Sequence, residues 1–147
     1  QRLRGLAQAL PLAGGSLDAI FCECVLSVTG AAGAVPHEAA RALRPGGWLV
    51  LSDLYLRSGG GARDGGGSCL AGAVSEAALR GRLEAAGLVI ELFEDHSRLL
   101  AELAGRLLFA GVEPGAFCAK GGRGGRPGYF LCLARPVPER AGTARSG

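Results

Sequence analysis

The stretch Arg41-Ala-Leu-Arg-Pro-Gly-Gly-Trp-Leu-Val-Leu-Ser-Asp-Leu-Tyr-Leu-Arg57 decides the fold of this chain. A short amphipathic helix precedes it and stops at Pro45, because a proline ring cannot continue a helix. The apolar positions of this helix are Val35, Ala39, Ala42 and Leu43. Gly46 and Gly47 then predict a tight turn, and the apolar run 48–51 predicts a buried parallel strand that ends at Ser52-Asp53. The carboxyl edge of such a sheet is where ligands bind in open α/β folds.

Two sequence blocks together resemble one enzyme family. Leu10-Pro11-Leu12-Ala13-Gly14-Gly15-Ser16-Leu17-Asp18-Ala19-Ile20 is similar to the block that leads S-adenosylmethionine-dependent methyltransferases of the Rossmann-like class into their fourth strand, here about residues 19–22. The L-R-P-G-G-x-L-V-L-S-D block is similar to their entry into the fifth strand. The resemblance implies an α/β fold: strands four to seven of a Rossmann-like methyltransferase sheet with flanking helices, a mixed sheet with an antiparallel edge. It also implies S-adenosyl-L-methionine as cofactor.

The cofactor loop of the resembled family is not in this sequence. The family's G-x-G-x-G turn and the acidic residue that ends its second strand should lie upstream of the Leu-Pro block, whereas the chain starts at Gln1 and has no Met. The glycines at 59–61 and 65–67 follow the fifth strand, and no helix start lies close enough for them to cradle an anion. We therefore expect residues 1–135 to be the carboxyl-terminal part of a methyltransferase domain and 136–147 a flexible tail. The missing amino-terminal part of the same domain is then the expected partner.

The second half of the chain predicts two more helices and two more strands. Ser75 is a good N-cap for a helix that ends at Gly87, and Ser97 for a helix that ends near Gly111. Their apolar positions are Leu79, Leu83 and Ala86 in the first helix and Leu99, Leu103 and Leu107 in the second. The predicted strands are 88–93 and 129–134. In the resembled fold the helix 97–111 would be an insertion above or beside the substrate side.

Composition narrows the class of partner. The chain has 147 residues, enough for one domain, and a net charge of +3 with scattered arginines, which gives no nucleic-acid footprint. No apolar run reaches the roughly 18 residues that a membrane span needs. Five cysteines, an odd number, indicate reduced thiols and a cytoplasmic setting. We expect a small-molecule substrate.

Two cysteines carry the chemistry. Cys24 follows Asp18 by six residues, and Cys69 opens a Cys-Leu-Ala-Gly-Ala block after the fifth strand. Arsenite methyltransferases are similar in both places, and the resemblance implies that Cys24 and Cys69 are the catalytic thiolates that hold a thiophilic, arsenite-like substrate. Soft sulfur ligands select soft centres of this kind.

The chain also differs from the arsenite methyltransferase branch of the family. Glu23 stands where the branch has Asn, Cys22 is additional, and the third cysteine of the branch is absent. The substrate could therefore be another thiophile or a small-molecule thiol. Alternatively, Cys24 and Cys69 are small buried hydrophobic residues, as cysteines often are. Cys118 and Cys132 are expected to be structural.

Four residues are candidates for contact with the cofactor. Gly5-Leu6-Ala7 stands where related methyltransferases have Gly-Asp-Ala against the adenine, so Leu6 and Ala7 offer the ring only apolar contact. Cys22 and Glu23 would line the methionine end. Asp53 and Tyr55 could face the substrate or cap their strand, and Asp95-His96 could form an acid–base pair but are expected at the surface.

Three functional hypotheses remain. The first is S-adenosylmethionine-dependent methyl transfer to a small, thiophilic acceptor, with this part of the domain inactive alone. The second is a non-catalytic methyltransferase-like binding module, favoured by Leu6 and the absent glycine loop. The third is a thiol-based metal-binding protein that uses Cys22-Glu23-Cys24, although C-x-C lacks the C-x-x-C spacing of redox motifs.

Overall fold

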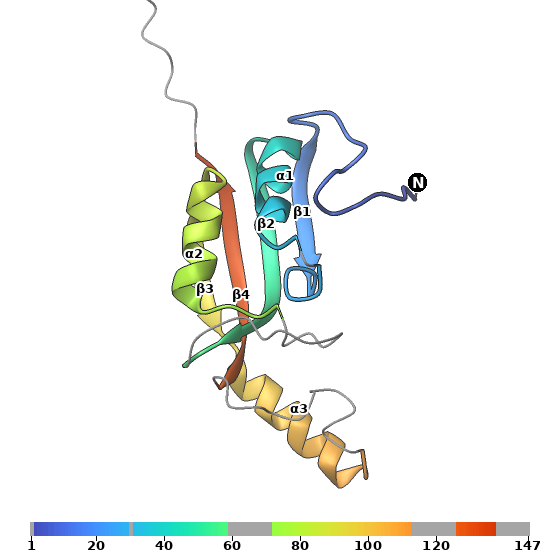
Figure 1. Cartoon of the computed structure of the whole chain (residues 1–147), viewed down its shortest axis with the longest axis vertical. Coiled ribbons are helices and arrows are strands. Elements are labelled where there is room, and N and C mark those ends of the chain that lie inside the picture. Colours follow the sequence, from blue (N-terminus) through green and yellow to red (C-terminus); the bar gives the residue numbers. More distant parts are fainter. Residues whose placement is uncertain (1, 30, 59–71, 113–125, 138–147) are drawn as a thin grey trace, which may run out of the picture.

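The structure is a computed structural model, and it describes residues 2–29, 31–58, 72–112 and 126–137 (Figure 1). Four strands and three helices follow one another along these residues. They are β1 (Leu17–Glu23), α1 (Ala34–Ala42), β2 (Leu43–Leu56), α2 (Glu76–Ala85), β3 (Leu88–Asp95), α3 (Ser97–Phe109) and β4 (Pro127–Pro136).

The strands form one mixed sheet in the order β1-β2-β4-β3. β1 and β2 are parallel, and β4 runs antiparallel to both β2 and β3. The predicted α/β class and mixed sheet are therefore confirmed. The predicted antiparallel edge is confirmed as well, because the last two strands, β3 and β4, pair antiparallel at one side of the sheet, with β3 outermost.

β2 is much longer than the four-residue apolar run predicted. It begins at Leu43, directly after α1, and the turn glycines cause an irregularity inside it: Leu17 pairs with Leu43, but Ala19 already pairs with Trp48. Gly46 takes a positive φ of 79° there, as a tight turn requires. The prediction that the strand ends at Ser52-Asp53 is wrong, because β4 pairs with residues 49–56 and extends β2 to Leu56.

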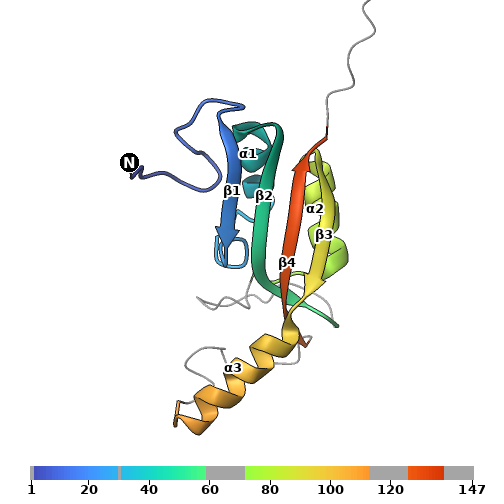
Figure 2. The same cartoon turned by 180° about the vertical axis from the view of Figure 1, so that it is seen from behind.

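The two faces of the sheet have different surroundings. α1 and α2 lie on one face (Figure 1). The side chains buried on that face of β2 and β4 are Leu49, Leu51, Phe130, Cys132 and Ala134. The opposite face is turned to the viewer in Figure 2 and carries no helix in the described part of the chain. The strand register lines up one apolar residue per strand across this open face, in the order Phe21, Val50, Leu133 and Leu92.

The two later helices begin differently. The Ser75 hydroxyl accepts a hydrogen bond from the Ala78 N–H at 3.2 Å, so the predicted cap of α2 is confirmed. The predicted cap of α3 is wrong: Ser97 is its first residue, and its N–H donates to Oδ1 of Asp95 at 2.7 Å. Whereas α2 buries Leu79 and Leu83, no residue of α3 between 97 and 109 is buried.

α3 points away from the sheet at the carboxyl end of β1 and β2 (Figures 1 and 2). At the other end, Pro136 closes β4, and the N–H of the next residue, Val137, donates to the carbonyl oxygen of Gly87 at 2.9 Å. Residues 138–147 of the expected tail lie outside the described ranges. None of the described helices combines the length and apolar character that crossing a bilayer requires.

Candidate functional site

Cys24 lies at the carboxyl edge of the parallel strand pair. It follows β1 directly, its side chain is exposed, and its N–H donates to the carbonyl oxygen of Ser52 at 2.8 Å. Its φ of 52° is in the left-handed region, which non-glycine residues rarely adopt. Such conformations collect at functional sites, where the surrounding structure holds them. The predicted edge position of Cys24 therefore agrees with the structure, and its exposure disagrees with the alternative of a buried hydrophobic residue.

A buried carboxylate fixes the loop that follows Cys24. Asp53 is 1% exposed, and its two carboxylate oxygens accept the N–H of Ser27 at 2.9 Å and the hydroxyl of Ser27 at 2.5 Å. Since an unpaired buried polar group is costly, both partners need this contact. Asp53 is thus shielded from solvent, and it holds loop 24–29 against β2.

Tyr129 comes close to Cys24 from β4. It pairs with Leu54 of β2, and its phenol interacts with the side chains of Ser52 and Cys24. The pKa of Tyr129 is raised, because the hydrogen bond with Ser52, which would lower it, is outweighed by burial of the phenol and by Cys24 and Glu23. The edge therefore groups a thiol, two hydroxyls and a carboxylate.

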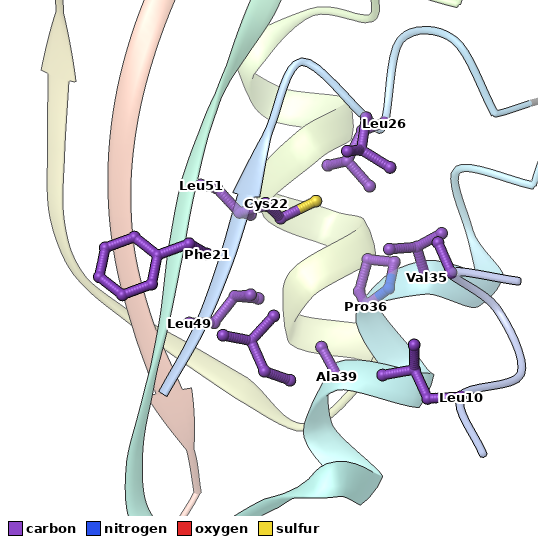
Figure 3. A pocket seen from close by; sticks show the side chains of 12 residues that line it. Leu10, Phe21, Cys22, Leu26, Val35, Pro36, Ala39, Leu49 and Leu51 are labelled. Atoms are coloured by element: carbon purple, nitrogen blue, oxygen red, sulfur yellow. The ribbon is translucent and has the colours of Figure 1, made fainter. Parts of the chain in front are cut away.

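Cys22 lies on the other face of β1, in an apolar pocket. The pocket has a volume of about 150 Å³ and lies between β1, α1 and the amino-terminal segment. Figure 3 shows the sulfur of Cys22 pointing toward Leu26 and Val35, while the ring of Phe21 lies on the opposite side of the strand. Burial raises the pKa of the Cys22 thiol to about 11, and the charges of Asp53 and Cys24 act in the same direction.

The four candidate cofactor residues fall into two groups. Ala7 and Cys22 both line this pocket. Leu6, with 62% of its surface exposed, and Glu23 at the end of β1 are open to solvent. The structure therefore gives Leu6 and Glu23 accessible side chains, and limits Ala7 and Cys22 to contacts made through the pocket.

Cys69 lies outside the described residues, as do the glycines at 59–67 and Cys118. The chain becomes described again at Gly72, three residues after Cys69. A Cβ atom on Gly72 would stand 2.3 Å from the carbonyl oxygen of Ser27 and 2.9 Å from its carbonyl carbon. Only a glycine allows this approach, so the chain at Gly72 packs on the loop that follows Cys24.

The remaining candidates have structural surroundings. His96 pairs with Glu94 at 2.9 Å between Nε2 and Oε2, and Asp95 pairs with Ser97 and with Arg57, so Asp95 and His96 do not form the acid–base pair that was considered. Tyr55 is 5% exposed and packs edge-on against Phe93 and Phe130. Cys132 is fully buried, as expected of a structural cysteine, and burial raises the pKa of its thiol to about 11. Among the described residues, no three or more His, Cys, Asp or Glu side chains form a group that could hold a metal ion.

The sequence did not identify Ser27 or Tyr129. Each reaches the edge through a long-range contact: Ser27 through Asp53, and Tyr129 through the pairing of β4 with β2. The one available signal was that a tyrosine opens the predicted last strand, at the end that an antiparallel strand places beside the carboxyl edge.

Comparisons with known proteins agree with this architecture. The family profile described as "Methyltransferase domain" matches residues 1–51. The [4+2]-cyclase SpnF has a similar structure, with a TM-score of 0.67 and 22% identity over 91% of this chain and 56% of its own. An arsenic(III) S-adenosylmethionine methyltransferase from Chlamydomonas reinhardtii matches with a TM-score of 0.61 and 21% identity, over 92% of this chain and 44% of its own. A geranyl diphosphate methyltransferase matches with a TM-score of 0.66 and 20% identity, over 89% of this chain and 51% of its own.

The chain has a Rossmann-like methyltransferase fold. It spans about half the length of the solved proteins that it matches. These proteins act on different substrates, so the shared fold does not specify the methyl acceptor.

Proposed function

We propose that this chain takes part in S-adenosylmethionine-dependent methyl transfer to a small, thiophilic, arsenite-like acceptor, which Cys24 and Cys69 hold. The fold supports methyl transfer, and the family profile matches the residues that lead into β1 and β2. Cys24 supports the acceptor class, because a soft, accessible sulfur lies at the edge of the sheet where ligands bind in α/β folds.

The contact between Gly72 and Ser27 carries the proposal. Ser27 follows Cys24 by three positions, and Gly72 follows Cys69 by three positions. Three residues of extended chain span about 10 Å at most. The close approach of Gly72 to Ser27 thus ties both cysteines, by short lengths of chain, to one point beside the carboxyl edge.

The residues of this chain have distinct proposed roles. Cys24 and Cys69 bind the acceptor, which loses hydroxyl groups as water when its bonds to sulfur form. Leu6 and Ala7 would meet the adenine ring, and Glu23 and Cys22 the methionine end of the cofactor; the exposure of Leu6 and Glu23 fits such a contact. When bound, S-adenosylmethionine supplies the methyl group as an electrophile. An acceptor with a lone pair needs no general base, which agrees with the absence of an Asp95–His96 pair among the described contacts.

We also propose that a further polypeptide segment, corresponding to the unmatched half of the solved proteins, completes the domain and carries the cofactor loop. β1 pairs only with β2 among the described strands, and parallel sheets are normally covered on both faces. Reduced thiols in the site suit a cytoplasmic setting.

The test is methyl transfer to arsenite by this chain together with that segment. Cys24→Ser and Cys69→Ser should each abolish turnover, whereas Cys118→Ser, as the matched control, should retain it. Turnover that survives both substitutions would refute the thiol pair. Cysteine-dependent methylation of another thiophile, with none of arsenite, would leave the mechanism standing and change the substrate.

A further inference from the structure

Two hydrogen bonds join the start of α3 to the main chain of Tyr129. The N–H of His96 donates to the carbonyl oxygen of Tyr129 at 2.7 Å, and the N–H of Tyr129 donates to the hydroxyl of Ser97 at 3.2 Å. Ser97 is held in turn by Asp95, which forms an ion pair with Arg57 of the β2 end at 3.3 Å. The main chain of Tyr129 is therefore fixed on both sides.

The side chain of Tyr129 leaves this anchored position toward the candidate site. Glu23 and Ser52 are register partners on the open face, and Tyr129 pairs with Leu54, two residues beyond Ser52 on the same face. At that diagonal position a long aromatic side chain can reach its neighbour. The phenol does so, since it interacts with the side chains of both Ser52 and Cys24.

Two features of the backbone fix the position of Cys24. Its N–H is bonded to Ser52 and its φ of 52° is set by the turn out of β1, but these contacts leave rotation about the Cα–Cβ bond open. A hydrogen bond to the sulfur is what selects one direction. Groups that hydrogen-bond a ligating side chain in this way orient it, and their loss typically weakens binding by about 10- to 100-fold.

We propose that Tyr129 is a positioning residue for the acceptor thiol, orienting the sulfur of Cys24 by its phenol while the start of α3 holds the phenol in place. The inference rests on the proposed function, because it assigns Tyr129 a part in binding the thiophilic acceptor. Through its hydrogen bonds with Tyr129, α3 is then connected to the site without any contact between the helix and the substrate.

The experiment is an arsenite titration of the complete chain under reducing conditions, followed by near-ultraviolet difference absorption and by intact-mass spectrometry. Each As–S bond replaces a hydroxyl of arsenite, which leaves as water with the thiol proton, so no redox step is involved. Arsenic at the sulfur of Cys24 alters the environment of the phenol and gives a tyrosine difference band. The chain has two tyrosines, so the variants Tyr129→Phe and Tyr55→Phe assign that band.

The expected result is an arsenite adduct that Cys24→Ser weakens, with a difference band that Tyr55→Phe retains and Tyr129→Phe removes. Tyr129→Phe should also raise the half-saturating arsenite concentration roughly tenfold. It loses only a hydroxyl from a half-buried ring, so circular dichroism should show an intact fold; Ser52→Ala, which leaves the bond to Cys24, should have a smaller effect.

The outcomes separate this inference from the proposed function. A Cys24-dependent adduct with unchanged affinity and an unchanged band in Tyr129→Phe overturns the role of Tyr129 and leaves the proposed function intact. The absence of any Cys24-dependent adduct in the wild-type chain overturns both.

Discussion

On the sheet face that α1 and α2 cover, Phe130 is 2% exposed, whereas on the opposite face Phe21 is 71% exposed. Both belong to apolar sets that the register places side by side across the strands. The run Trp48–Leu51 has no alternation of apolar and polar residues, which is typical of a strand covered on both faces. Both faces of the sheet are therefore apolar enough to be buried, but the described residues cover only one of them.

We expect the largest effect when the same substitution, phenylalanine to alanine, is made on each face of the sheet and the losses of stability are compared. Phe130→Ala removes a fully packed ring and should lower the free energy of unfolding by about 3–5 kcal/mol. Phe21→Ala, the matched control, should change it by about 0.5 kcal/mol or less, as at other surface positions. Urea denaturation monitored by circular dichroism measures both values. Equal losses would show that Phe21 is already buried in solution.

Alkaline pH tests the covered face through its two buried thiols. Burial raises the pKa of Cys22 and of Cys132 from 9.0 to about 11, so each thiol holds its proton more tightly in the folded chain than in the unfolded one. The two protonated thiols contribute fully to the free energy of unfolding below about pH 9. This contribution is lost as the pH rises to 11, by up to about 2–3 kcal/mol per thiol.

Denaturation at pH 8 and at pH 10.5 measures this loss. The variant Cys132→Ala is the control, since it should show a smaller decrease between the two pH values than the wild type. An identical decrease in both proteins would mean that the thiol of Cys132 does not titrate with unfolding.

Self-association tests the open face. An apolar row across four strands, together with the β1 edge that only β2 pairs among the described strands, invites contact between copies of the chain. Phe21→Glu should weaken association at least about tenfold, or about 1.4 kcal/mol. Sedimentation equilibrium measures the change. Leu103→Glu is the control, because Leu103 is also half exposed but lies on α3. A strictly monomeric wild type, or a larger effect of Leu103→Glu, would contradict the assignment to this face.

Local signals in the sequence predicted local structure well. The cap at Ser75, the end of α1 before Pro45 and the strand at the Leu-Pro block depend on residues close in sequence, and the structure has all three. The same type of signal failed at Ser97, because its hydroxyl donates to Asp95 and accepts the N–H of Tyr129.

Features that depend on strand pairing could not be predicted in this way. β2 extends to Leu56 because β4 pairs with it, and Tyr129 reaches Cys24 for the same reason. The position of Cys24 at the edge followed from the strand pattern, whereas the contact of Gly72 with Ser27 joins residues 45 positions apart and left no signal in either segment.

The most direct test of the central claim is X-ray absorption at the arsenic edge on the arsenite-loaded protein. The account predicts two sulfur neighbours at about 2.3 Å, the usual length of a metal–thiolate bond. Cys24→Ser and Cys69→Ser should each reduce them to one, and Cys22→Ala should leave both. An arsenic centre with only oxygen neighbours in the wild type, or two sulfurs that persist without Cys24, would contradict the account.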